Sequence, residues 1–249
     1  MKRKGNSFRK LTDAALSILV LLGTMGLAWV GLRGTKTVPT MAPPAETDDP
    51  TAFIPAEAAA IVVDAGHGGF DGGAVGSGTG VVEAELNLTV AKLLADELTK
   101  RGFYVVMTRS GPDAIGESKN EDMKRRREIM NYENIDLVVS IHMNKFRDTS
   151  ISGPMVFYMK GSEEGRSLAE RVIAGVCEAV GRPLRCANPE DLFVLRVPSA
   201  PSVLVECGFL SNREDEAKLM DPEYQKALAH GIAEGIADYL AAKENGDND

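Results

Sequence analysis

The chain has 249 residues, of which 44% are hydrophobic and 26% are charged, and it carries a formal net charge of −8. This composition is typical of a globular protein, and the length fits one α/β domain with a small appendage. The acidic balance excludes a general nucleic-acid binder, because neutralising phosphate groups requires a basic surface.

The N-terminal segment predicts a membrane anchor. A basic cytoplasmic tail, residues 1–13, precedes an uncharged and mostly apolar run, residues 14–32, which is about long enough to cross a bilayer as a helix. The basic residues predict that the tail stays in the cytoplasm and that the remainder of the chain lies outside. The alternative is a cleaved signal peptide, although the apolar region of a signal peptide is usually shorter.

A linker and one folded domain are expected after this segment. Residues 33–57 are rich in proline, threonine, alanine and acidic residues and lack hydrophobic periodicity, which predicts a flexible tether. The folded domain is expected over residues 58–243, and residues 244–249 are expected to form a disordered tail.

Within the domain, apolar runs alternate with segments of helical periodicity. Asn212 is a plausible N-cap and Gly102 a plausible C-cap of two of the expected helices. This alternation predicts an α/β fold, with a mostly parallel or mixed twisted sheet of about six strands and helices on both faces. Strands are expected at residues 61–64, 103–108, 136–141, 154–159, 192–196 and 202–205, and helices at 83–101, 117–134, 163–180, 212–220 and 222–243.

Four residues that are distant in sequence are expected at one edge of this sheet. His67, His142 and Glu206 each come at the end of an expected strand, and Glu83 opens the first helix. Ligands of open α/β sheets bind beyond the carboxyl ends of the strands, so these side chains are expected to meet there.

The residue types at this edge predict a zinc hydrolase. Two imidazoles and a carboxylate are a known ligand set of catalytic zinc, which keeps a fourth position for water. We expect Zn²⁺ to be bound by His67, Glu83 and His142, with Glu206 as general base and then general acid. The alternative is that the histidines are structural and that Glu83 is a solvated carboxylate stabilised by the helix macrodipole.

Other polar features have simpler interpretations. The glycine-rich loop after the first strand contains neither GxxxxGK[ST] nor GxGxxG, which argues against a phosphate cradle. Arg109 either points into the crevice to hold an anionic substrate group or forms a surface salt bridge. Residues 124–127 predict a solvated helix face. His230 is expected to be structural or solvated.

Free or buried thiols are expected, because no CxxC occurs and an odd number of cysteines cannot all pair. The three cysteines are Cys177, Cys186 and Cys207.

Four segments together resemble a known family. VVDAGHGGFDGGAVG, EAELNL, DLVVSIHMN and PSVLVECGFLSN look like the signature blocks of the type 3 zinc-dependent N-acetylmuramoyl-L-alanine amidases, in order, and the resemblance covers nearly all of residues 60–240. The resemblance implies that His67, Glu83 and His142 bind the metal and that Glu206 acts as general base and then general acid. Glu85 is the nearest rival to Glu83, but the spacing to the following helix leucine favours Glu83.

The resemblance implies hydrolysis of the amide bond between N-acetylmuramic acid and L-alanine in peptidoglycan. Its partners would be the glycan strand and the stem peptide, with Arg109 and Asn144 as candidate substrate-binding residues, and the membrane through the N-terminal helix. About a dozen residues separate Asn144 from the next strand, too few for the inserted helix that blocks the groove in some relatives, so an open groove is expected. The short single domain and the ending EYQKALAHGIAEGIADYL resemble the branch that trims spore cortex during sporulation.

Three alternatives remain at the level of sequence. The first is a zinc peptidase or deacetylase acting on another extracellular substrate. The second is an inactive anchored cell-wall-binding protein, although competent residue types fill all four candidate positions. The third is an anchored adaptor that recruits a separate hydrolase.

Overall fold

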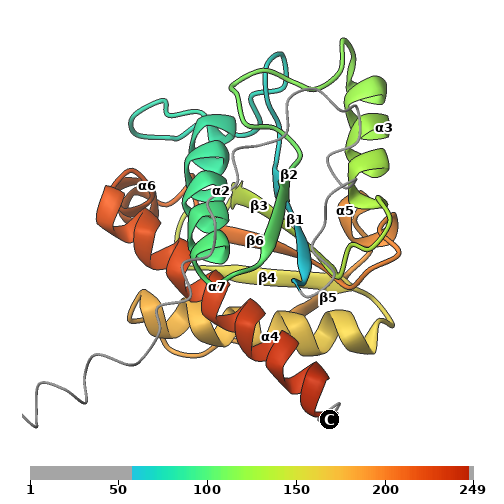
Figure 1. Ribbon diagram of the computed structural model, residues 1–249. Coiled ribbons are helices and arrows are strands. Elements are labelled where there is room, and N and C mark those ends of the chain that lie inside the picture. Colours follow the sequence, from blue (N-terminus) through green and yellow to red (C-terminus); the bar gives the residue numbers. More distant parts are fainter. Residues whose placement is uncertain (1–57, 247–249) are drawn as a thin grey trace, which may run out of the picture. The chain divides into compact units, whose positions relative to one another are not determined.

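A six-stranded mixed sheet forms the centre of the domain in this computed structural model, which describes residues 58–246 (Figure 1). The expected N-terminal tail, membrane segment and linker, residues 1–57, therefore lie outside the described residues. The strand order is β2-β1-β3-β6-β4-β5. The strands are β1 Ala60–Ala65, β2 Tyr104–Met107, β3 Leu137–Asn144, β4 Met155–Met159, β5 Asn188–Glu190 and β6 Ser202–Phe209.

Four of the strands run parallel. β1 lies between β2 and β3, and β3 pairs in parallel with β6. β4 runs antiparallel to β6 and carries β5 at the edge of the sheet. The prediction of a mostly parallel or mixed sheet of about six strands is confirmed.

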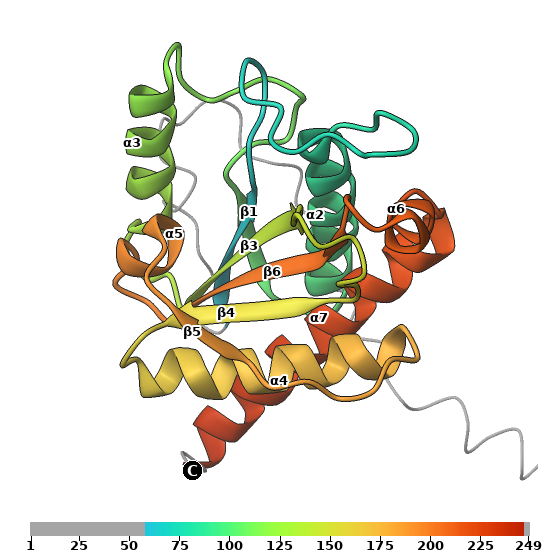
Figure 2. The same ribbon diagram turned by 180° about the vertical axis from the view of Figure 1, so that it is seen from behind.

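Helices cover both faces of the sheet, as the alternating pattern predicts. One face packs against α2, α4 and α7, and the other packs against α3 and α5 (Figures 1 and 2). The helices are α2 Glu83–Lys100, α3 Lys119–Met130, α4 Glu163–Ala179, α5 Phe193–Arg196, α6 Arg213–Leu219 and α7 Pro222–Asn245. Within residues 58–246, no helix has the length and apolar character needed to cross a bilayer.

Helix ends follow the local sequence. The Asn212 side chain caps α6 by accepting hydrogen bonds from the backbone N–H groups of Glu214 and Asp215, as predicted. Gly102 follows the C-cap residue Arg101 of α2 with a φ of 90°, a conformation that glycine adopts without penalty. α7 continues past residue 243, the expected end of the domain, to Asn245.

The expected strand at residues 192–196 is wrong. Leu192 is the N-cap of the short helix α5, which residues 193–196 form. Val194 and Leu195 pack into the core, and the strand of this region is the preceding segment β5. A short apolar run does not distinguish a buried helix from a buried strand. β5 contains Pro189, which an edge strand tolerates because one side of it makes no ladder hydrogen bonds.

Two other strands are longer than expected. β3 and β6 continue through His142 and Glu206, which therefore lie within strands and not just beyond them. The register between β3 and β6 shifts after His142, an irregularity of the kind that redirects side chains beside functional sites.

Candidate metal centre

His67 leaves β1 in an unusual backbone conformation. Its φ is 59°, in the left-handed region that residues other than glycine rarely adopt. The Nδ1 atom lies 3.0 Å from Oδ1 of Asp71, and the Nε2 atom lies 3.2 Å from Oε1 of Glu83. Because Asp71 occupies Nδ1, the free nitrogen of His67 faces Glu83.

Glu83 is placed by the glycine-rich loop that precedes it. The N-cap residue of α2, Val82, makes no side-chain capping bond. The backbone carbonyls of Ala74 and Gly72 instead accept hydrogen bonds from the N–H groups of Glu83 and Ala84. The N–H of Ala74 in turn donates to Oε2 of Glu83 at 2.8 Å. The loop therefore caps the helix and fixes its first carboxylate, which is only 4% exposed.

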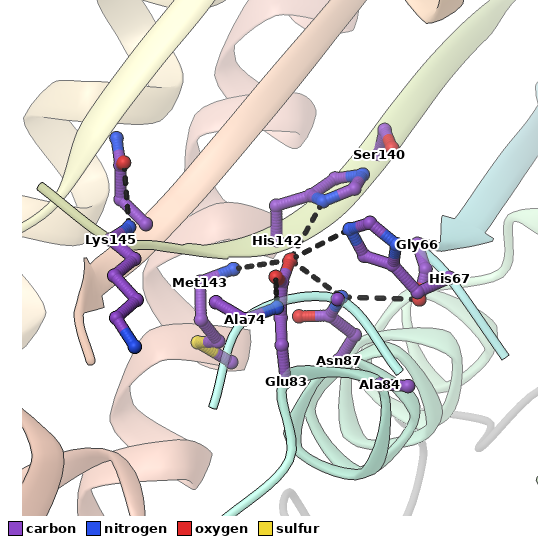
Figure 3. Close-up of polar contacts among 12 residues, drawn as sticks. Gly66, His67, Ala74, Glu83, Ala84, Asn87, Ser140, His142, Met143 and Lys145 are labelled. Atoms are coloured by element: carbon purple, nitrogen blue, oxygen red, sulfur yellow. Dashed lines mark hydrogen bonds and ion pairs between the residues drawn. The ribbon is translucent and has the colours of Figure 1, made fainter. Parts of the chain in front are cut away.

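His142 approaches the same carboxylate from β3. Its Nδ1 atom lies 2.9 Å from Oε1 of Glu83. The two imidazole rings meet edge to face, with centroids 5.0 Å apart and an interplanar angle of 79°. His67 therefore presents Nε2 and His142 presents Nδ1 to a common point beside Glu83 (Figure 3).

The arrangement of donors fits a metal ion. The ligand atoms of His67, Glu83 and His142 all lie within 4.8 Å of one another. Oε1 of Glu83 also has the amide nitrogens of Asn87 and Met143 at 3.2 and 3.3 Å. Four nitrogen atoms thus surround one oxygen, which has only about two lone pairs to offer. A cation bound by the two imidazoles and the carboxylate would explain why so many nitrogen atoms lie around Oε1 of Glu83.

The distances agree with this interpretation. Ligand atoms about 2.0–2.1 Å from a tetrahedral zinc ion lie roughly 3.3 Å apart, and the two histidine–Glu83 distances are 3.2 and 2.9 Å. Burial acts to raise the pKa of Glu83, but hydrogen bonds from His142 and His67 outweigh it and hold the pKa well below its usual range. Glu83 is therefore ionised, as a metal ligand must be.

Glu206 lies on the strand next to His142. The two residues are partners in the β3–β6 register, and Oε2 of Glu206 is buried without a hydrogen-bond partner among residues 58–246. Burial, with a smaller contribution from the charge of Glu83, raises the pKa of Glu206 to about 7. A carboxyl group with a pKa near neutrality can take up and release a proton at working pH.

The two expected substrate-binding residues, Arg109 and Asn144, differ in position and contacts. Arg109 is only 3% exposed, and its guanidinium donates to backbone carbonyl oxygens, so it neither faces the crevice nor forms a surface salt bridge. Asn144 ends β3, and its side-chain oxygen accepts a hydrogen bond from the N–H of Lys145. The connection from β3 to β4 is a loop without a helix, as expected.

Sequence reasoning missed three polar residues around the histidines. Asp71 contacts His67, and Asn87 contacts Glu83. Arg126 is buried, although the sequence predicts a solvated helix face at residues 124–127. Asp71 lies four residues after His67, a spacing that is visible in the sequence, whereas Arg126 is one of four consecutive basic residues. The cysteines are free, with Cys177 and Cys207 buried and Cys186 exposed, as expected.

The carboxyl edge of this α/β sheet brings together two histidines, an ionised carboxylate and a second carboxyl group with a raised pKa. Such a site is typical of the metal-dependent hydrolases. Residues 61–238 match the family described as N-acetylmuramoyl-L-alanine amidase (Amidase_3), and the chain belongs to this family. Its activity is hydrolysis of the amide bond between N-acetylmuramic acid and L-alanine in cell-wall peptidoglycan. The action of a cell-wall amidase is extracytoplasmic.

Individual relatives agree with this assignment. The germination-specific N-acetylmuramoyl-L-alanine amidase of Bacillus subtilis is 31% identical over 199 residues, which cover 76% of this chain and 83% of that protein. The CwlD amidase of Clostridioides difficile, solved in complex with the GerS lipoprotein, is 32% identical with a TM-score of 0.71, covering 74% of this chain and 99% of that one. The catalytic domain of CwlV from Paenibacillus polymyxa is 31% identical with a TM-score of 0.67, covering 74% and 98%.

Proposed function

We propose that this amidase is a zinc enzyme in which His67, Glu83 and His142 hold the metal and Glu206 transfers the proton. The observation that carries the proposal is the convergence of two imidazole nitrogens on one oxygen of Glu83, together with the buried Oε2 atom of Glu206, which has no hydrogen-bond partner among residues 58–246. Nitrogen and carboxylate ligands in a set of three are typical of catalytic zinc.

The reaction follows from the chemistry of these groups. When bound, zinc supplies Lewis acidity and lowers the pKa of water to about 7. The carboxylate of Glu206 accepts a proton from the attacking water and then donates it to the nitrogen of L-alanine as the amide bond breaks. In the metal-free protein the pKa of Glu206 is raised to about 7, so this carboxyl group can both accept and donate a proton near neutral pH.

The test compares the full-length protein with three variants. Zinc content and release of stem peptides from peptidoglycan are measured for wild type, His142→Ala, Glu206→Gln and His230→Ala. His230 is the matched control, because it is the third histidine of the chain and lies exposed on α7. We expect about one zinc ion per chain in all except His142→Ala, and activity only in wild type and His230→Ala. Activity without bound metal, or a full zinc complement in His142→Ala, would contradict the proposal.

The biological substrate is proposed to be spore cortex peptidoglycan. The similarity to the germination-specific amidase of B. subtilis and to C. difficile CwlD supports this substrate. Deleting the gene in its host should leave cortex stem peptides attached to muramic acid while the vegetative wall is unchanged. Muropeptide analysis of both walls checks this, and a change confined to the vegetative wall would contradict it.

Residues 14–32 are proposed to anchor the enzyme to the membrane, with the catalytic domain outside. Their uncharged apolar sequence and the basic residues before them support this proposal. The full-length protein should remain in the membrane fraction after a high-pH wash, and deleting residues 14–32 should release it. Recovery of a shortened chain lacking these residues from the medium would indicate a cleaved signal peptide instead.

A further inference from the structure

Two arginine side chains are buried beneath the candidate metal centre. Arg109 follows β2 and is 3% exposed, and Arg126 lies on α3 and is 2% exposed. Burying a guanidinium is costly unless its donors are paired, and removing one partner of a buried charge is more costly still. Both arginines therefore need partners that compensate for their burial.

The partners that the two side chains divide between them include the carbonyl oxygens of three successive residues, Ala65, Gly66 and His67. Arg109 donates from Nε to the carbonyl of Ala65 at 2.9 Å and from Nη2 to that of Gly66 at 2.9 Å. Arg126 donates from Nη1 to the carbonyl of Ala65 at 2.9 Å and from Nη2 to that of His67 at 2.6 Å. The two side chains together hold every carbonyl of the turn that leaves β1.

This turn needs such support because of its conformation. His67 has a φ of 59°, and a residue other than glycine in this region stores on the order of 1–3 kcal/mol of strain. Such strain persists only where the surroundings fix the backbone. The bond from Arg126 to the His67 carbonyl is the direct restraint on this residue's own peptide group.

Arg109 also connects the turn to the helix that carries Glu83. The same Nη2 atom that binds the Gly66 carbonyl donates to the carbonyl of Ala84 at 2.8 Å. One guanidinium group thus joins the residue before His67 to the residue after Glu83. This contact fixes the position of one candidate ligand relative to the other.

Arg126 has a second set of contacts, which stabilise the fold more generally. It donates to Oδ2 of Asp122 at 2.7 Å and to Oδ1 of Asp64 at 2.6 Å. Asp64 also accepts hydrogen bonds from the hydroxyls of Thr108 and Ser140. We call these residues around Asp64 the Asp64 network. Its bonds can be weakened without removing the contact between Arg126 and the His67 carbonyl.

We propose that Arg109 and Arg126 are positioning residues for the metal centre. The two arginines hold the carbonyls of residues 65–67 so that His67 and Glu83 face a common point. The inference rests on the proposed metal ligation by His67, Glu83 and His142. It assigns to Arg109 a role other than the substrate contact expected from the sequence.

The test uses Arg109→Lys and Arg126→Lys in the full-length protein. Lysine keeps the positive charge but lacks the planar fork that reaches two carbonyls at once. Zinc affinity is measured by competition with a chelator, the visible spectrum is recorded with Co²⁺ in place of zinc, and unfolding by urea gives the stability. We expect each variant to bind zinc about 10- to 100-fold more weakly, as is typical when groups supporting a metal ligand are removed. The Co²⁺ spectrum should change, because the ligand geometry relaxes.

Two matched controls separate positioning from general stabilisation. Arg127→Lys changes the exposed neighbour of Arg126 on α3 and should leave zinc affinity and stability unchanged. Thr108→Val removes a hydroxyl from the Asp64 network without touching the turn, so it should lower stability and leave zinc affinity unchanged. This second control remains informative even if one arginine variant does not fold.

The outcomes are distinct. Wild-type zinc affinity and Co²⁺ spectrum in both arginine variants would overturn the inference while the proposed metal ligands stand. Loss of zinc affinity in Thr108→Val, in proportion to lost stability, would also overturn it, since the arginines would then act only through the fold. A wild-type protein that binds no zinc overturns the proposed metal centre, and the positioning role with it.

Discussion

Glu206 and His142 are register partners on the adjacent parallel strands β6 and β3. Register partners in a parallel pair extend from the same face of the sheet, so the carboxyl group of Glu206 lies beside a candidate metal ligand without a residue between them. The backbone pairing alone fixes this proximity. It places the Glu206 carboxyl group, whose Oε2 atom has no hydrogen-bond partner in the described part of the chain, next to the group of His67, Glu83 and His142.

Replacing Glu206 by glutamine should slow catalysis strongly and leave metal binding intact. The amide has nearly the same shape but cannot accept a proton from water, and proton transfer by a positioned side chain is worth about 10²- to 10⁴-fold in rate. Stem-peptide release at saturating substrate should fall by this factor, with the zinc content of wild type. A Glu206→Gln enzyme with more than about a tenth of wild-type activity would show that another group moves the proton.

The stability of the metal-free protein should depend on pH through Glu206. The pKa of this group is raised from its ordinary 4.5 to about 7 in the folded state, so the folded protein binds the proton more tightly than the unfolded chain. Stability contributed by the protonated group is complete below about pH 4.5 and is lost as the pH rises through about 7. The loss is on the order of 3 kcal/mol.

The Glu206→Gln variant separates the pH dependence caused by Glu206 from that caused by other titrating groups. Urea unfolding of chelator-treated wild type and Glu206→Gln is compared at about pH 4.5 and about pH 8. We expect the variant to gain stability relative to wild type between the two pH values, because glutamine does not ionise. An equal difference at both pH values would mean that the folded state does not raise the pKa of Glu206.

Asp71 should control which nitrogen of His67 is free to bind metal. Its Oδ1 atom lies 3.0 Å from Nδ1 of His67, so the carboxylate accepts the Nδ1 proton and leaves the Nε2 lone pair toward Glu83. In Asp71→Asn the amide can donate to Nδ1, which favours the opposite tautomer. Zinc affinity, measured by chelator competition, should fall about 10- to 100-fold.

Lys119 provides the control for this prediction. Its ammonium group lies 3.3 Å from the other carboxylate oxygen of Asp71 and is largely exposed. Lys119→Gln removes this surface pair, which is worth at most about 1 kcal/mol, and leaves the His67 contact in place. A loss of zinc affinity in Lys119→Gln as large as in Asp71→Asn would show that the local charge matters and the tautomer does not.

The sequence predicts most of this fold because its buried strands are short apolar runs between amphipathic helices. It fails where a pattern is ambiguous or interrupted. The apolar residues of α5 suit either a helix or a strand, and Pro189 conceals the edge strand β5. His142 and Glu206 interrupt the apolar pattern of β3 and β6, although both strands continue through them.

The candidate ligands could be predicted because histidine is rare in this chain and two of its three histidines end apolar runs. The residues that support them could not be predicted in the same way. Arg126 stands in a run of four basic residues, and only its burial against Asp64 distinguishes it from its exposed neighbours. Arg109 lies just after β2, but its orientation depends on carbonyl groups whose positions the sequence does not reveal.

Gly66 should be essential because it leaves room for the imidazole of His142. A β-carbon added at this position would lie 2.3 Å from Cε1 and Nε2 of His142, closer than atoms can approach. In Gly66→Ala the ring must move and take Nδ1 away from Glu83, and a misplacement of about 1 Å can reduce the rate about 100-fold. Gly111→Ala is the control, since a β-carbon there meets no atom within 4 Å. We expect Gly66→Ala to lose zinc and at least about 99% of stem-peptide release while Gly111→Ala keeps both. Full zinc content and activity in Gly66→Ala would show that His142 can bind metal from another position.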